Sequence, residues 1–180
     1  MPNDPNARVH VPVLLGEVLE AFRGPGTAEE LEGWIVDGTV GSGGHARAVL
    51  EHFPRVRLFG ADQDPEVLAH ARRSLADFGS RVVLCQARVS QLYPRLVAEG
   101  VAPVVGFLLD LGVNSLHFDH PERGFSLQAD GPLDMRMDPT RARTAADIVN
   151  HWDEEDLADL FYYEGDERNS RAIARAVVTA

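Results

Sequence analysis

A glycine-rich loop bounded by acidic residues is the part of this chain whose residue types and spacing could support chemistry. The loop reads DGTVGSGGH from Asp37 to His45 and contains Gly43 and Gly44. Glycine readily adopts positive φ angles and lets a ligand approach the main chain closely. If a helix begins where the loop ends, its first N–H groups and its dipole attract an anion. We therefore expect the loop to hold a carboxylate or phosphate group of a ligand.

A second acid, Asp62, follows Gly43 by 19 residues and ends the next apolar segment. A carboxylate at that point can accept hydrogen bonds from the two hydroxyls of a ribose. Gly41, Gly43 and Ala46 also match the dinucleotide-binding fingerprint, which S-adenosylmethionine proteins share in its geometry. Together these features indicate a cofactor that contains an adenine nucleoside. The alternative is that the glycines only turn the chain and the aspartates cap helices.

A third acid, Asp110, is the candidate for catalysis. It ends a run of apolar residues and is followed by Leu111 and Gly112. In open α/β sheets, ligands bind beyond the carboxyl ends of the strands, so Asp110 would lie beside the same cleft as the other two acids. The alternative is an aspartate that caps the next turn.

The elements that must position these acids repeat along the first 110 residues. Four short apolar segments, about 25 residues apart, indicate the strands of a parallel sheet. The segments between them read as helices; for example, Asp64 and Pro65 are a typical helix start. Ser90 is the expected cap of a further short helix that runs through Leu96. The expected strands comprise residues 34–36, 56–61, 82–85 and 104–109. Because these strands are almost entirely apolar, we expect helices to cover both faces of the sheet.

The pattern changes after Asp110. Residues 114–138 are rich in Gly, Pro, Asp, His and Arg, and three helices are then expected at 144–152, 154–163 and 168–178. We expect residues 1–115 to form the cofactor-binding part of one domain and residues 116–180 to form a loop and an incomplete helical insertion. Four strands are few for this amount of helix, so we expect the chain to be truncated within a helical region.

Composition excludes several classes of protein. The net charge is −11, with 17 basic and 28 acidic residues, which argues against a chain that coats nucleic acid by bulk electrostatics. No apolar run reaches the length of a membrane helix. The single cysteine excludes an internal disulfide and a cysteine-based zinc site, so we expect a cytoplasmic protein. His117 and His120 can bind metals, but no third ligand converges on them, and we expect no metal.

Motifs in order along nearly the whole chain give it a close resemblance to a known family. They are HVPVLL at 10–15, DGT at 37–39, GGH at 43–45, DQDP at 62–65, DLGV at 110–113, RGFS at 123–126, DGPLDMRMD at 130–138 and RAIARA at 171–176. The chain resembles the RsmH/MraW family of bacterial methyltransferases, which use S-adenosylmethionine to methylate N4 of a cytosine in 16S ribosomal RNA. The resemblance implies an α/β fold of the Rossmann-like class I methyltransferase type, with a parallel-sheet core and the start of an inserted helical domain.

The resemblance also implies roles for individual residues. The cofactor-binding positions are Gly43, Gly44, His45, Asp62, Val89, Asp110 and His117. Val89 stands where the family often has an aromatic residue, and His117 stands where relatives commonly have glutamine. Asp110 is implied to act at the site of methyl transfer, where it would hold the protons of the N4 amine.

The implied substrate is 16S ribosomal RNA within the small ribosomal subunit, with no role for DNA or a membrane. Arg123, Phe125 and Arg136 are candidate RNA contacts, through phosphate pairing and base stacking. Their alternative role is structural, with Phe125 packing the insertion onto the main domain. Two other functions stay open: a nicotinamide-dependent oxidoreductase that uses the same loop, and an inactive fragment that retains cofactor binding. The sequence does not indicate an oligomeric state.

Overall fold

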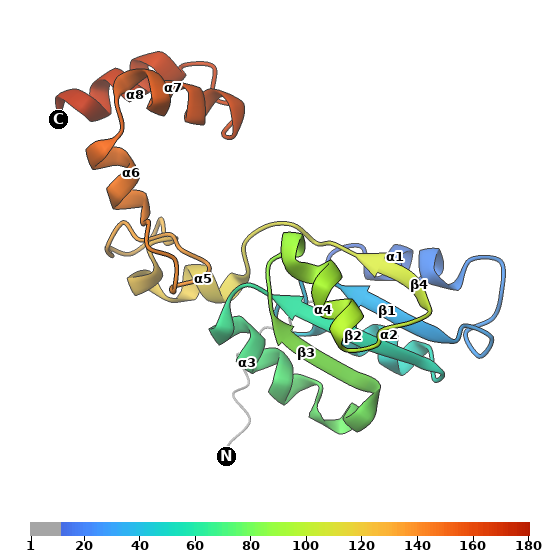
Figure 1. Cartoon of the computed structure of the whole chain (residues 1–180). Helices are drawn as coiled ribbons and strands as arrows, with labels where there is room; N and C mark the ends of the chain where they lie inside the picture. The colour runs from blue at the N-terminus through green and yellow to red at the C-terminus, as the bar shows by residue number, and fades with distance from the viewer. Residues whose placement is uncertain (1–11) are drawn as a thin grey trace. The chain divides into compact units, whose positions relative to one another are not determined.

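The computed structural model describes residues 12–180, so His10 and Val11, with which the resemblance begins, lie outside the described residues. The chain divides into two compact units after Asn114, and each is described by itself (Figure 1). No helix within residues 12–180 combines the length and the apolar character needed to cross a membrane.

A parallel sheet forms the centre of the first unit. Its strands are β1 (Gly33–Asp37), β2 (Val56–Asp62), β3 (Val82–Gln86) and β4 (Val104–Leu108). Their order across the sheet is β3-β2-β1-β4, and every neighbouring pair is parallel (Figure 1). The predicted strands are therefore confirmed. Because consecutive parallel strands need a crossover, a connection that contains a helix separates each strand from the next.

The helices of this unit are α1 (Leu15–Arg23), α2 (Gly44–His52), α3 (Pro65–Ser74) and α4 (Leu92–Ala98). The predicted start of α3 is confirmed, because the Asp64 carboxylate accepts the amide of Glu66 at 2.8 Å. The prediction that Ser90 caps a helix is wrong. Residues Val89–Gln91 form a 3₁₀ turn, η2, so α4 begins at Leu92 and Gln91 is its N-cap residue.

Helix α1 was not expected from the sequence. Its apolar residues Leu15, Val18, Leu19 and Phe22 follow the i, i+3, i+4, i+7 spacing of an amphipathic helix, so the signal was present. Leu19 and Phe22 pack against the core on one face of the sheet.

Alternate residues of the central strands build two cores, because successive side chains of a strand point to opposite faces. Ile35 belongs to the core beneath α1, α2 and α3. Trp34 and Val36 belong to the other core, to which α4 contributes Leu92. The expectation that both faces are covered is confirmed over β1 and β2, but not over β4, where Phe107 is 47% exposed.

The second unit is helical and contains α5 (Ser115–Asp119), the 3₁₀ turn η3 (Pro121–Arg123), α6 (Ala145–His151), α7 (Glu154–Tyr163) and α8 (Ser170–Thr179). The three predicted helices near the end of the chain are confirmed, although α8 begins at Ser170 and not at Arg168. A capping box between Thr144 and Asp147 starts α6. Leu157 and Ala174 join α7 to α8 in a small core.

Candidate active site

The parallel sheet brings three aspartates to one edge. Asp37 and Asp62 are the last residues of β1 and β2, and Asp110 follows the end of β4 by two residues. Leu108 of β4 pairs with Asp37, which sets the end of β4 beside the end of β1. The carboxyl edge of an open α/β sheet is the usual ligand site. The sequence prediction that these acids share an edge is therefore confirmed.

The glycine loop is held against the end of β2 by the side chain of Asp62. Gly41 donates its amide to Asp62 Oδ2 at 3.0 Å, and Asp64 donates its amide to Asp62 Oδ1 at 2.9 Å. These two bonds orient the Asp62 carboxylate at the end of β2. Gly41 has a φ of 56° and Gly43 a φ of 94°, so both lie in the left-handed region that the sequence predicted for this loop.

The loop leads directly into α2, whose N-cap is Gly43. Within residues 12–180, no side chain caps this helix terminus, in contrast to α3, which Asp64 caps. A helix start without a side-chain cap leaves its first amides to water or to a ligand. The start of α2 therefore fits an anionic group, as the sequence analysis expected.

Asp37 is buried in the middle of this edge. It is 2% exposed and accepts the amide of Thr39 at 3.1 Å. Burial, together with the nearby negative charges of Asp62 and Asp110, raises the pKa of Asp37 to about 7. A cationic group bound at this edge would stabilise all three carboxylates. From the sequence, Asp37 was placed at this edge but was given no role in binding. Its position as the first residue of the glycine loop was the signal that could have indicated such a role.

Asp110 faces the open side of the edge, with its side chain 52% exposed. Its backbone amide donates to Thr39 Oγ1 at 2.7 Å, which ties the chain after β4 to the glycine loop. The next helix, α5, begins only at Ser115, so Asp110 does not cap it. The alternative role that the sequence offered for Asp110, the cap of the next turn, stays open.

His45 lies behind Asp110. Its Nδ1 is 3.8 Å from Asp110 Oδ2, and its Nε2 donates to the carbonyl oxygen of Val13 at 2.9 Å. The cofactor contact implied for His45 by the sequence stays a prediction, and the fold adds the contact of its ring with Asp110.

Val89 begins the turn η2, just after β3, and is partly exposed. The amide of Ala87 donates to the carbonyl oxygen of Asp62 at 3.0 Å, so the segment before Val89 runs alongside the end of β2. A position near the end of β2 agrees with the cofactor contact predicted for Val89. The contact itself stays a prediction.

The remaining predicted site residues belong to the second unit. His117 is only 3% exposed and stacks on Phe125, with their ring centroids 4.9 Å apart. Phe125 is therefore a buried aromatic residue within the second unit, and its alternative role of packing the insertion onto the main domain stays open. The cofactor contact predicted for His117 and the RNA contact predicted for Phe125 stay predictions.

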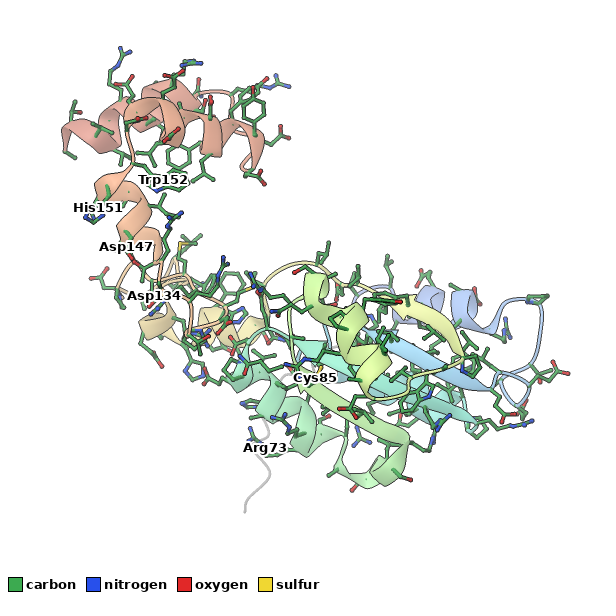
Figure 2. The ribbon with its side chains drawn as sticks, in the orientation of Figure 1. Arg73, Cys85, Asp134, Asp147, His151 and Trp152 are labelled. Carbon is green, nitrogen blue, oxygen red and sulfur yellow. The ribbon has the colours of Figure 1, made fainter. Side chains whose placement is uncertain are left out.

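Arg123 and Arg136 fold the irregular loop of this unit. Arg123 donates to the carbonyl oxygens of Arg136 and Met137 at 3.0 and 3.2 Å. Arg136 makes a two-bond contact with Asp134, at 2.8 and 2.7 Å (Asp134 is labelled in Figure 2). The hydrogen bonds from Arg136 hold the pKa of Asp134 below its usual value. Both guanidinium groups therefore have a structural role, and the RNA contacts predicted for them stay predictions.

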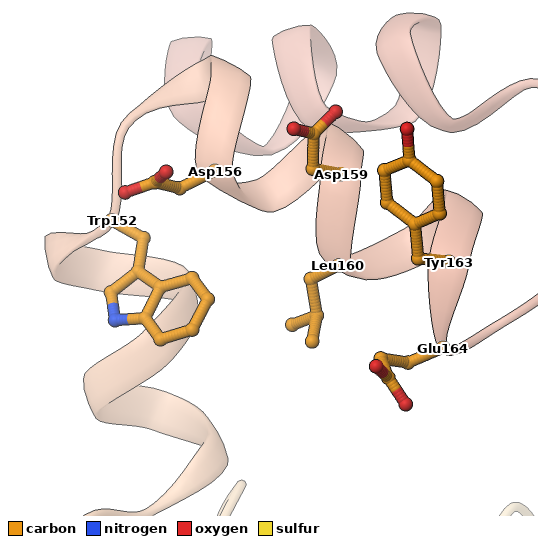
Figure 3. Close-up of a pocket in the computed structure, with 6 residues that line it drawn as sticks. All are labelled: Trp152, Asp156, Asp159, Leu160, Tyr163 and Glu164. Carbon is orange, nitrogen blue, oxygen red and sulfur yellow. The ribbon is translucent and has the colours of Figure 1, made fainter.

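The second unit also contains an open pocket that no predicted site residue lines. Trp152 and Tyr163 supply aromatic walls (Figure 3). Its other lining residues are Asp156, Asp159, Leu160 and Glu164. The guanidinium of Arg143 lies 5.6 Å from the centre of the Trp152 ring. Among the residues that the structure describes, no three His, Cys, Asp or Glu side chains form a metal-binding group.

Comparison with known proteins gives a consistent match. The model of the MraW methylase family matches residues 7–180. A protein of Parafrankia sp. is 48% identical over 174 residues, which are 94% of this chain and 51% of that protein. A protein of Halorhodospira halophila is 47% identical over 180 residues, covering 98% of this chain and 53% of its own length. Both are named ribosomal RNA small subunit methyltransferase H. The chain spans about half the length of the curated relatives that it matches.

Proposed function

The chain belongs to the MraW methylase family, and from this premise we propose that it transfers a methyl group from S-adenosylmethionine to RNA of the small ribosomal subunit. The finer proposal is methylation of N4 of a cytosine in 16S ribosomal RNA. The single observation that carries the proposal is the arrangement at the sheet edge, where three neighbouring aspartates accompany a helix start that no described side chain caps. The names of the relatives support a methyltransferase over a nicotinamide-dependent oxidoreductase.

The residues at this edge fit S-adenosylmethionine group by group. The start of α2, after Gly43 and Gly44, suits the carboxylate of the amino-acid part. Asp62, oriented by two amides, suits the ribose hydroxyls. The negative charges of Asp37 and Asp110 suit the ammonium and sulfonium groups. We propose that Val89 contacts the adenine and that His117 is a further cofactor contact.

The chemistry that the cofactor supplies is a methyl group on a positively charged sulfur. The N4 amine of cytosine is a weak nucleophile, because its lone pair is delocalised into the ring. Asp110 is exposed at the edge, where it can accept a hydrogen bond from this amine and hold it in line with the methyl group. The carbonyl oxygen of Leu111 is a second candidate acceptor. The base must leave its stack to reach this position.

We propose that the substrate is an assembled or nearly assembled small subunit in the cytoplasm, and not naked RNA. The acidic balance of the chain gives it little general attraction for phosphate. Recognition would therefore depend on the shape of the subunit. The loop that Arg123 and Arg136 fold, together with Phe125, is the proposed RNA contact of the second unit.

Calorimetric titration of the 180-residue chain with S-adenosylmethionine tests the proposal first. We expect saturable binding, competition by S-adenosylhomocysteine and no binding of NADH. Transfer of a labelled methyl group to small subunits, with the modified base identified by mass spectrometry, then tests the activity. Binding without transfer would support the inactive fragment, and binding of NADH would favour the oxidoreductase. A circular-dichroism melt on the same sample shows whether a chain that fails to bind is folded.

A further inference from the structure

The contacts of His45 define which of its ring nitrogens carries a proton. Nε2 lies 2.9 Å from the carbonyl oxygen of Val13. A carbonyl oxygen only accepts hydrogen bonds, so Nε2 must be the donor. In the neutral ring Nδ1 then carries a lone pair, and Nδ1 is the nitrogen that faces Asp110 Oδ2, at 3.8 Å.

His45 and Asp110 differ in burial: the imidazole is the inner group of the pair and the carboxylate is the outer group. The His45 side chain is 10% exposed, whereas that of Asp110 is 52% exposed. The carboxylate thus meets solvent or substrate on one side and the imidazole on the other. Asp110 is the charged side chain paired with His45 among the described residues, and Asp37 and Asp62 are the other acids of this edge. On the other side of the ring, Nε2 faces the main-chain carbonyl of Val13.

We propose that His45 is the final acceptor, through Asp110, of the proton that the cytosine amine loses during methyl transfer. This inference rests on the function proposed above. The N4–CH₃ bond forms as the S–CH₃ bond breaks, and the surplus proton on N4 passes to the Asp110 carboxylate. It then passes to Nδ1 of His45, while Nε2 keeps its bond to Val13. This step requires the 3.8 Å separation to shorten to hydrogen-bond length, which the exposed side chain of Asp110 has room to do by rotation.

Charge balance favours this route. Before transfer, the carboxylates of the edge face a positive sulfur; after transfer, that sulfur is neutral. An imidazolium beside Asp110 restores a positive charge among the three acids. Imidazole is also a stronger base than a carboxylate, so it retains the proton at neutral pH better than Asp110 would alone. His45 acts behind Asp110 and positions the proton, without contacting the base.

The variant His45→Gln keeps one contact of the ring, with the carbonyl of Val13, and removes the other, with Asp110. Its side-chain amide can still donate towards the carbonyl of Val13, but it offers no base to Asp110. We expect its single-turnover rate of methyl transfer at pH 7.5 to fall about 100-fold, the usual scale for loss of a general base. We expect the dissociation constant for S-adenosylmethionine to change less than about threefold, because the cofactor contact proposed at the start of α2 uses main-chain amides, which the substitution keeps. His52→Gln, at the exposed end of the same helix, is the matched control and should leave both values unchanged.

The pH profile distinguishes proton transfer from a merely structural role. Because a ring that carries protons on both nitrogens accepts no further proton, the profile of rate against pH should differ in shape between the wild-type chain and His45→Gln. Asp37, with a pKa of about 7, contributes to both profiles. An unchanged rate in His45→Gln, or equal losses of rate and affinity with the same profile shape, would overturn the inference and leave the proposed function intact.

A measurement on the chain without cofactor does not depend on activity. Nitrogen-15 spectra of the histidine rings above neutral pH should show that the proton of His45 is on Nε2. A proton on Nδ1 would overturn the inference whatever the rates. If the wild-type chain binds S-adenosylmethionine, shows this tautomer and transfers no methyl group to small subunits, the proposed function fails and the inference fails with it.

Discussion

The three aspartates of the sheet edge have different surroundings, and these give them different expected properties. Asp37 is buried among like charges, Asp62 is oriented by two amides, and Asp110 is open to solvent. A ligand that brings positive charge to this edge would favour the ionised form of Asp37, which burial and the neighbouring charges disfavour.

Asp37 should make the stability of the chain depend on pH. Its pKa is about 7 in the folded chain and 3.8 as a reference, so the folded state binds the proton more tightly than the unfolded state. Stability from this group is therefore present at low pH and is lost as pH rises towards 7. In urea unfolding, the free energy of unfolding of the wild type minus that of Asp37→Asn should fall by about 3 to 4 kcal/mol between pH 4.5 and pH 8. A difference that is constant across this range would contradict the burial of an ionisable Asp37.

Asp62 should contribute directly to cofactor affinity. Replacement by alanine removes two hydrogen bonds to the ribose, and we expect S-adenosylmethionine to bind about 2 to 4 kcal/mol more weakly. Calorimetric titration measures this loss, and Glu29→Ala, an exposed site of the same unit, is the control. Unchanged affinity in a folded Asp62→Ala variant would exclude the ribose assignment.

At the scale of the elements, Arg81 joins the end of α2 to the start of β2. Its guanidinium donates to the carbonyl oxygens of Leu50 and Phe53 at 3.0 and 2.7 Å and to that of Val56 at 3.0 Å. These carbonyls include the last ones of a helix, which have no partner inside it. Arg81 therefore anchors α2, the helix that contains His45 and follows the glycine loop.

Replacement of Arg81 by alanine should lower the free energy of unfolding by about 2 to 3 kcal/mol, since hydrogen bonds from a charged group contribute roughly 1.5 to 3 kcal/mol. Chemical denaturation measures the loss. Arg73→Ala is the control, because Arg73 lies on the exposed side of α3 (Figure 2). A loss for Arg81→Ala no greater than that for Arg73→Ala would show that α2 does not need this anchor.

At the scale of the whole molecule, the distribution of charge limits how the chain meets RNA. Residues 153–167, which include α7, hold eight acidic and no basic residues. Such a segment repels phosphate, and with a net charge of −11 we expect little general electrostatic attraction between the chain and RNA.

We therefore expect assembled small subunits to be methylated at least about tenfold faster than naked 16S RNA at the same concentration. The expected difference comes from shape recognition, because bulk attraction to phosphate is weak. Initial rates of methyl transfer with the two substrates measure it, and a salt series distinguishes electrostatic from shape-dependent binding. Equal rates on the two substrates would contradict the assembled subunit as the substrate.

The sequence by itself determined the parallel sheet, the helix starts at Asp64 and Thr144, the glycine loop and the acids at the strand ends. These depend on local periodicity and on short motifs, which a linear sequence contains in full. Local signals can also mislead. Ser90 is a residue type that often caps a helix, but here it lies within the 3₁₀ turn η2, which such a signal does not distinguish from a helix start.

Only the tertiary structure decided which groups meet across long stretches of chain. The burial of Asp37, the pairing of His45 with Asp110 and with Val13, and the carbonyl partners of Arg123 and Arg136 all depend on contacts between distant or irregular segments. A polar side chain is compatible with many partners, and its neighbours are fixed only when the packed elements exclude the others. The same arginines that suggested RNA contacts in the sequence therefore became, in the folded chain, the donors that hold its loop together.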